Sequence, residues 1–281
     1  MEAVGRKFSV PIEMCLKKVL EEGKGVIILA GPSLCGKGEI GKALCSILSI
    51  PTKRYLSMGD ILRQTIEEAK INESFKKDLA IKYNISYKIS IFDPDYNNKE
   101  DIQKARLHEE DVISYLSLKS NNISQFDWLE YCVLNGVLVP DQCTTSVFDA
   151  LLENSKELQN SIFILDGHPR TVVAAAHMLK TLDKLKIPVI KVFHLFITKE
   201  EMKARGLDRN RADDNLDSLK RRYKFYMDHV QPAISLIKNK IGYKNTCLID
   251  ANQPVYFNNG ELDLESSINN VVLSVLLALG N

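Results

Sequence analysis

The sequence predicts an α/β fold in which helices wrap a parallel β-sheet. Short apolar runs alternate with segments of helical periodicity, and a glycine-rich turn follows the first run. The apolar runs that predict strands are 26–30, 162–165, 189–197 and 247–249, with Tyr55 and Leu56 as a fifth candidate. Functional groups in such folds gather where the parallel strands end, so we expect the site at that edge of the sheet.

The glycine-rich turn, residues 31–38, has the pattern GxxxxGK. Such a turn between a buried strand and a helix directs backbone N–H groups and the positive helix end at an anion, and Lys37 adds a cation. Apolar residues at three- and four-residue steps predict the helix that follows, at Ile40, Ala43, Leu44, Ile47 and Leu48. The turn therefore predicts a phosphate-binding site, although Gly38 stands where Ser or Thr is usual.

Other segments have clear local patterns. Residues 9–22 predict a helix that Gly23 closes. The run from Ile81 to Ile91 alternates isoleucine and tyrosine with other residues, which predicts a strand with one buried face. Helices are expected over 99–118 and around 128–133.

Composition excludes several functional classes. The chain has 281 residues, a formal charge of +1, 45% hydrophobic and 26% charged residues. This balance argues against a protein that coats nucleic acid or an acidic membrane, so neither is an expected partner. We find no export or anchoring segment and no zinc-type cysteine spacing, and we expect a cytoplasmic protein.

Five motifs in a fixed order carry a more specific signal. They are GPSLCGK at 31–37, SMGDILR at 57–63, GVLVPD at 136–141, DGHPRT at 166–171 and RADD at 211–214. Over about residues 25–70 and 128–257 the chain resembles the adenylate kinase family of nucleoside monophosphate kinases.

The resemblance implies a P-loop NTPase three-layer fold with a five-stranded parallel sheet. It implies a kinase core of residues 1–56 and 137–281, in which about 205–214 form a lid of the short type. It also implies a subdomain for the nucleoside monophosphate (NMP) at 57–136, enlarged here by an insertion at about 71–127. Three roles for the insertion remain open besides a plain structural one: shaping the acceptor pocket, oligomerisation and docking another protein.

The implied activity is transfer of the γ-phosphoryl group of ATP to AMP or another NMP, with Mg²⁺ bound alongside ATP. The implied catalytic cations are Lys37, Arg63, Arg170, Arg205, Arg211 and Arg222. The implied ATP-binding residues are Ser33, Leu34, Cys35, Gly36, Lys37, Gly38, Glu39, Arg205 and Gln253. The implied NMP-binding residues are Met58, Arg63, Val137, Val139, Gly167, Arg170, Ala174, Arg211 and Arg222. Asp166 would orient water around the phosphate-bound Mg²⁺.

The departures from the family pattern fall mainly on base recognition. Met58 and Ala174 replace residues at positions that discriminate acceptor bases, and Glu201 stands where an arginine packs on the donor base. Glu39 replaces a threonine beside the phosphates, where it would either help hold Mg²⁺ or repel phosphate. His168 replaces a phenylalanine, and we expect it to be packed.

Three functions agree with this sequence. The leading one is an adenylate kinase-like enzyme, and the second is a UMP/CMP or broad-specificity NMP kinase. The third is a catalytically silent nucleotide-binding protein whose insertion recruits a partner.

Overall fold

The computed structural model describes residues 21, 23–94, 96, 99–118, 122–135, 137–209 and 216–280. The chain forms two compact units, and each is described by itself. Unit 1 comprises Met1–Ser57 and Ser155–Asn281, and unit 2 comprises Met58–Asn154. The helix expected over 9–22 lies outside the described residues except for Glu21 and so stays a prediction.

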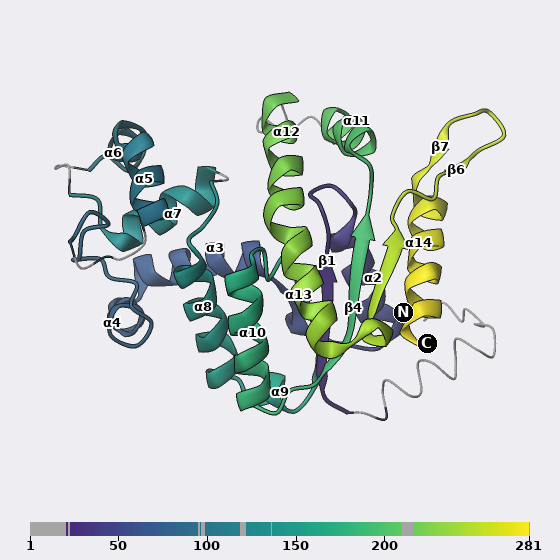
Figure 1. Cartoon of the computed structure of the whole chain (residues 1–281), viewed down its shortest axis with the longest axis horizontal. Helices are drawn as coiled ribbons and strands as arrows, with labels where there is room; N and C mark the ends of the chain where they lie inside the picture. The colour runs from purple at the N-terminus through teal and green to yellow at the C-terminus, as the bar shows by residue number, and fades with distance from the viewer. Residues whose placement is uncertain are drawn as a thin grey trace. The chain divides into compact units, whose positions relative to one another are not determined.

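Unit 1 contains the predicted five-stranded parallel sheet (Figure 1). Its strands are β1 (Gly25–Ala30), β2 (Tyr55–Ser57), β3 (Ile162–Asp166), β4 (Val189–Phe196) and β5 (Thr246–Asp250). The spatial order is β2-β3-β1-β4-β5, and every neighbouring pair is parallel. All six residues of β1 are buried, because this central strand has a partner on each side and helices over both faces.

Two sets of helices cover the sheet. The helices of unit 1 are α2 (Lys37–Ile47), α9 (Lys156–Gln159), α10 (Val172–Lys184), α11 (Lys199–Arg209), α12 (Leu216–Phe225), α13 (Gln231–Ile241) and α14 (Leu264–Leu279). Ile27 and Leu29 of β1 pack in one core cluster with residues of α2 and α14. Ala30 packs on the other side with Tyr226 and Ile234. Because side chains alternate along β1, this strand contributes residues to the packing on both faces of the sheet.

Short elements complete unit 1. They are the 3₁₀ turns η1 (Thr52–Arg54) and η3 (Tyr243–Asn245), the π-helical turn η2 (Tyr226–Val230), and the hairpin strands β6 (Val255–Tyr256) and β7 (Leu262–Asp263). The turn η2 joins α12 to α13 without a break in the helical path (Figure 1). Within the described part of the chain, no helix combines the length and apolarity needed to cross a membrane.

Unit 2 is helical. It contains α3 (Met58–Ile71), α4 (Glu73–Lys82), α5 (Lys99–Leu107), α6 (Glu109–Leu116), α7 (Gln125–Asn135) and α8 (Asp141–Asn154). Unit 2 extends to Asn154, because α8 packs against α3. The NMP-binding subdomain expected at 57–136 stays a prediction.

Two local predictions in unit 2 are wrong. No strand forms over 81–91: α4 continues to Lys82, and Asn84 has a left-handed φ of 56° that interrupts an extended path. The alternating residues do not share a buried face, since Ile81 is 82% exposed whereas Ile85 is 1% exposed. The helix expected over 99–118 is divided into α5 and α6 at His108, whose φ and ψ of −114° and 11° are not helical.

Candidate functional site

The loop after β1 has the backbone of a phosphate cradle. Gly31, Leu34 and Gly36 have positive φ values of 148°, 66° and 86°, and Gly36 lies directly before the first residue of α2. A Cβ atom at Gly31 would lie 2.2 Å from the carbonyl oxygen of Leu195 in β4. Glycine is therefore required where the loop leaves the sheet, and the loop runs straight into a helix N-terminus.

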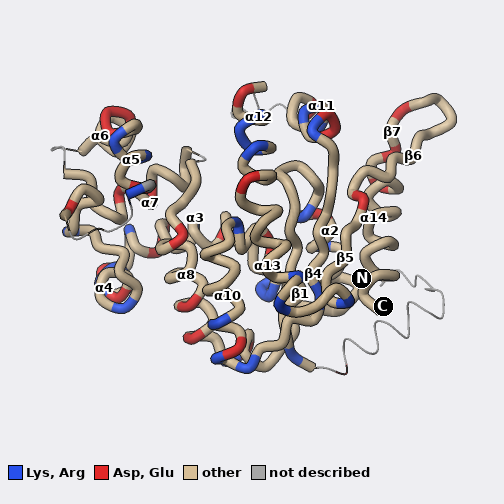
Figure 2. Tube along the Cα trace, in the orientation of Figure 1, with Lys and Arg blue, Asp and Glu red and all other residues tan. Residues whose placement is uncertain are grey.

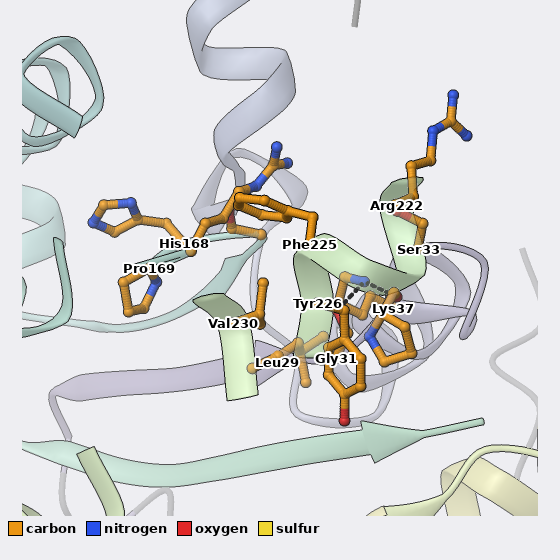
Figure 3. A pocket seen from close by; sticks show the side chains of 14 residues that line it. Leu29, Gly31, Ser33, Lys37, His168, Pro169, Arg222, Phe225, Tyr226 and Val230 are labelled. Atoms are coloured by element: carbon orange, nitrogen blue, oxygen red, sulfur yellow. Dashed lines mark hydrogen bonds between the residues drawn. The ribbon is translucent and has the colours of Figure 1, made fainter. Parts of the chain in front are cut away.

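Lys37 folds back over this loop. Its Nζ atom donates to the carbonyl oxygens of Pro32 at 2.8 Å and Gly31 at 3.3 Å, and lies 3.6 Å from Sγ of Cys35 (Figure 3). An ammonium group beside backbone N–H groups and a helix N-terminus can bind a multiply charged anion.

A pocket with a volume of about 90 Å³ opens beside the loop (Figure 3). It is lined by loop residues, by the turn after β3 and by one face of α12 and η2. The lining residues are Leu29, Ala30, Gly31, Pro32, Ser33, Lys37, Gly167, His168, Pro169, Arg170, Arg222, Phe225, Tyr226 and Val230. Lys37, Arg170 and Arg222 supply positive charge from three separate segments, and none of the described lining residues is acidic. The pocket is therefore suited to a polyanion.

Arg222 lies four residues before Tyr226 on a helical stretch, so both side chains lie on the same face. Figure 2 shows blue segments along this stretch of α12, which mark its lysines and arginines. The Tyr226 hydroxyl lies 2.6 Å from Nε2 of His194 in β4. Burial lowers the pKa of His194 to about 4, with a smaller contribution from Lys238, and burial raises the pKa of Tyr226 to about 12. Both groups are neutral at pH 7, and their hydrogen bond fixes the end of α12 to the sheet.

Asp166 ends β3 beside the loop. Its Oδ2 atom accepts a hydrogen bond from the Tyr55 hydroxyl at 2.6 Å. Its Oδ1 atom is buried and has no hydrogen-bond partner among the described atoms. The described residues contain no cluster of three or more His, Cys, Asp or Glu that could hold a metal by itself.

His168 is packed, as predicted, since its side chain is 2% exposed. Burial lowers its pKa to about 3, and the nearby Arg170 acts in the same direction. The Nε atom of Arg170 donates to the Gly167 carbonyl oxygen at 2.9 Å. The imidazole is thus neutral at pH 7 and adds no charge to the pocket.

Arg205 makes contacts that its expected role did not predict. Its guanidinium donates to the carbonyl oxygens of Leu34 at 3.1 Å and Ala251 at 2.8 Å, and to Oδ1 of Asn252 at 3.1 Å. Glu201 accepts from the side-chain amide of Asn252 and from the backbone N–H of Thr198. Glu201 is therefore a helix-capping residue that also holds the amide facing Arg205.

Two further donor-side residues are engaged locally. The side-chain amide of Gln253 donates to Oγ of Ser274 at 3.0 Å and to the carbonyl oxygen of Asp250 at 2.8 Å. Glu39 is exposed and pairs with Lys42 at 3.0 Å, one helical turn away. Neither contact tests their predicted contribution to ATP binding, so both stay predictions.

The predicted acceptor residues are divided between the units. In unit 1, Ala174 is 1% exposed in the first turn of α10, where its N–H donates to the Thr171 hydroxyl. In unit 2, Met58 is 2% exposed and Arg63 pairs with Asp60. Also in unit 2, Val139 is 8% exposed and Val137 is half-buried. Arg211 and the rest of the predicted lid from 210 to 214 lie outside the described residues.

The structure places Tyr55, Tyr226 and Asn252 at the candidate site, and the sequence did not single them out. Tyr226 had a usable signal, because it follows Arg222 by one helical turn. No sequence signal could have identified Tyr55 and Asn252, because their contacts with Asp166 and Arg205 join segments that are far apart in the chain.

Comparisons with known proteins agree with this geometry. The family model for adenylate kinase matches residues 123–241. An adenylate kinase of Synechococcus sp. (strain CC9902) is 36% identical over 105 residues, which cover 37% of this chain and 56% of that protein. The chain thus spans little more than half of this relative, and it spans 59% of a Bacteroides thetaiotaomicron adenylate kinase that is 30% identical over 114 residues, or 39% of this chain.

Longer matches have lower identity. The adenylate kinase of Trichodesmium erythraeum is 25% identical over 234 residues, covering 82% of this chain and 91% of that protein. That of Cyanothece sp. (strain PCC 7425) is 25% identical over 250 residues, covering 88% and 94%. With the five-stranded parallel sheet and the phosphate loop in place, these matches support membership of the adenylate kinase family.

Proposed function

We propose that the protein is a nucleoside monophosphate kinase that transfers the γ-phosphoryl group of ATP to AMP or another NMP. The observation that carries the proposal is that Lys37, Arg170 and Arg222 line one pocket at the phosphate loop. Phosphoryl transfer requires cations positioned around oxygens whose negative charge is redistributed in the transition state. The three cations line this pocket from α2, the turn after β3 and α12.

The proposed chemistry is electrostatic. The acceptor phosphate is already an anion, so no side chain has to remove a proton from it. His168 and Tyr226, which line the pocket, are held neutral at pH 7 by burial and do not compete for the phosphates. Lys37 would exchange its contacts with loop carbonyls for contacts with the transferring phosphates.

Asp166 fits the predicted role beside Mg²⁺. Its buried Oδ1 atom has no hydrogen-bond partner among the described atoms and is therefore able to accept from a metal-bound water. When bound with ATP, Mg²⁺ would neutralise part of the phosphate charge.

A coupled assay with ATP against AMP, CMP, UMP, GMP and dAMP tests the proposal. We expect turnover with at least one acceptor and dependence on Mg²⁺. Absence of turnover with every acceptor, in protein whose cooperative unfolding shows that it is folded, would contradict the proposal. Nucleotide binding without turnover would then favour the catalytically silent alternative.

Broad acceptor specificity is the second candidate, and Ala174 supports it. A methyl group that is 1% exposed offers no hydrogen bond to a base edge. Without such a bond, discrimination between bases falls to what pocket shape supplies, about 10- to 200-fold. If the AMP rate exceeds the others by more than about a thousandfold, this second candidate is wrong.

A further inference from the structure

The contact between Tyr55 and Asp166 is the part of the site that the proposed function has not used. Tyr55 starts β2, and Asp166 ends the adjacent strand β3. The Tyr55 hydroxyl donates to Oδ2 of Asp166 at 2.6 Å, a short hydrogen bond to a carboxylate. The other oxygen, Oδ1, is buried without a hydrogen-bond partner among the described atoms. The hydroxyl therefore restricts rotation of the carboxylate and leaves one oxygen available.

A glycine in α2 makes room for the Tyr55 ring. A Cβ atom at Gly41 would lie 2.2 Å from Cε2 and 2.9 Å from Cδ2 of Tyr55. A Cβ atom at Gly38 would lie 3.9 Å from the Tyr55 hydroxyl oxygen. The ring thus packs directly on the first turns of the helix that follows the phosphate loop, and its hydroxyl reaches Asp166 along that surface.

We infer that Tyr55 is a positioning residue, which acts through Asp166 on the Mg²⁺ that accompanies ATP. By occupying Oδ2, it turns the carboxylate so that Oδ1 accepts from a water of the phosphate-bound metal. Gly41 is required for the same arrangement, because any larger residue would displace the Tyr55 ring. The inference rests on the proposed function, since it assumes that Mg²⁺ and ATP bind at the phosphate loop.

Direct binding measurements test the inference without requiring turnover. The dissociation constant for ATP is measured by calorimetry with Mg²⁺ and with EDTA, and their ratio gives the metal-dependent gain in affinity. We expect Tyr55→Phe to leave the EDTA value unchanged within about twofold and to reduce the metal-dependent gain about three- to tenfold. Tyr243→Phe is the matched control, because this ring is 70% exposed and should change neither value.

Two further variants separate positioning from packing. Gly41→Ala keeps the hydroxyl but removes the space for the ring, and it should reduce the metal-dependent gain in the same direction. In an Asp166→Asn background, Tyr55→Phe should have no further effect, because the residue acts through the carboxylate.

Equal loss of affinity with Mg²⁺ and with EDTA would overturn the inference, as would an undiminished effect in the Asp166→Asn background. An unchanged gain in both Tyr55→Phe and Gly41→Ala would overturn it while leaving the proposed function intact. If the wild-type protein bound no ATP, or bound it with no response to Mg²⁺, the proposed function and this inference would both be wrong.

Discussion

The guanidinium of Arg205 donates a hydrogen bond to the carbonyl oxygen of Leu34, 3.1 Å away in the phosphate loop. Leu34 has a φ of 66°, which is uncommon for a residue with a side chain. The same guanidinium holds Ala251 and Asn252 after β5. Arg205 thus joins α11, the loop and the end of β5, and it supports a strained loop conformation.

We therefore expect Arg205→Lys to destabilise the conformation of the phosphate loop. A lysine ammonium cannot reproduce the planar fork that serves these acceptors together. The free energy of unfolding should fall by about 1–2 kcal/mol, and the ATP dissociation constant should rise. Urea unfolding and ATP titration measure the two effects. Lys203→Arg, the reverse exchange on the same helix, is the control, and unchanged stability and binding in Arg205→Lys would contradict the expectation.

Lys37→Met tests the electrostatic account of the pocket. Lys37 contacts loop carbonyls and Cys35, so its removal should leave the fold intact. Loss of one charge-stabilising donor should lower kcat by about a hundredfold or more. Initial rates and circular dichroism check the two statements. Retention of wild-type kcat by a folded variant would refute the assigned role.

Gly31→Ala should be strongly destabilising. The new methyl group would lie 2.2 Å from the Leu195 carbonyl oxygen, so loop or strand must shift. We expect the free energy of unfolding to fall by more than about 2 kcal/mol. Gly242→Ala is the matched control, because Gly242 has a φ of 90° but nothing within 4 Å of an added Cβ. That change should cost only the backbone strain, about 1–3 kcal/mol, and less than Gly31→Ala. If both variants lost the same free energy of unfolding, the predicted clash with the Leu195 carbonyl would have no cost, and this prediction would be wrong.

The buried His194 should make stability depend on acid. Its folded-state pKa of about 4 lies below the ordinary value of 6.5, so the unfolded chain binds the proton more readily. The contribution of the neutral His194 to the free energy of unfolding is then fully present above pH 6.5, and it is lost as the pH falls toward 4. Between pH 7 and 5 this histidine alone should remove about 2 kcal/mol.

His194→Gln isolates this contribution. The amide can still bond to Tyr226, but it does not titrate. Urea unfolding at pH 7 and pH 5 should show a smaller loss of unfolding free energy in the variant than in the wild type. The loss in the variant is not zero, because the buried His168 is present in both proteins. Identical losses would mean that His194 does not titrate in this way.

Patterns confined to a few neighbouring residues predicted much of the fold. The apolar runs identified every strand of the main sheet, including the short β2 at Tyr55. The glycine pattern at 31–38 predicted the loop because the positive φ values at Gly31 and Gly36 suit glycine. These predictions are confirmed because the burial pattern and the backbone conformation of each segment depend on residues that are close together in the sequence.

The wrong predictions concern segments whose conformation depends on distant contacts. The alternation over 81–91 imitates a strand, but among the described residues its one pairing is the bridge between Ser90 and Ser124. A strand without partners cannot satisfy its backbone groups. Unit 2 extends to Asn154 because α8 packs on α3, a contact that the sequence of α8 does not indicate.

The sequence by itself determined the sheet, the phosphate loop and the identity of its cation Lys37, since each follows from residues adjacent in the chain. Only the tertiary structure decided which side chains hold the site residues in place. Tyr55 binds Asp166 and Asn252 binds Arg205 across separations of 111 and 47 residues. Parallel strands bring such distant residues together at one edge of a sheet, and no local pattern records which of them meet.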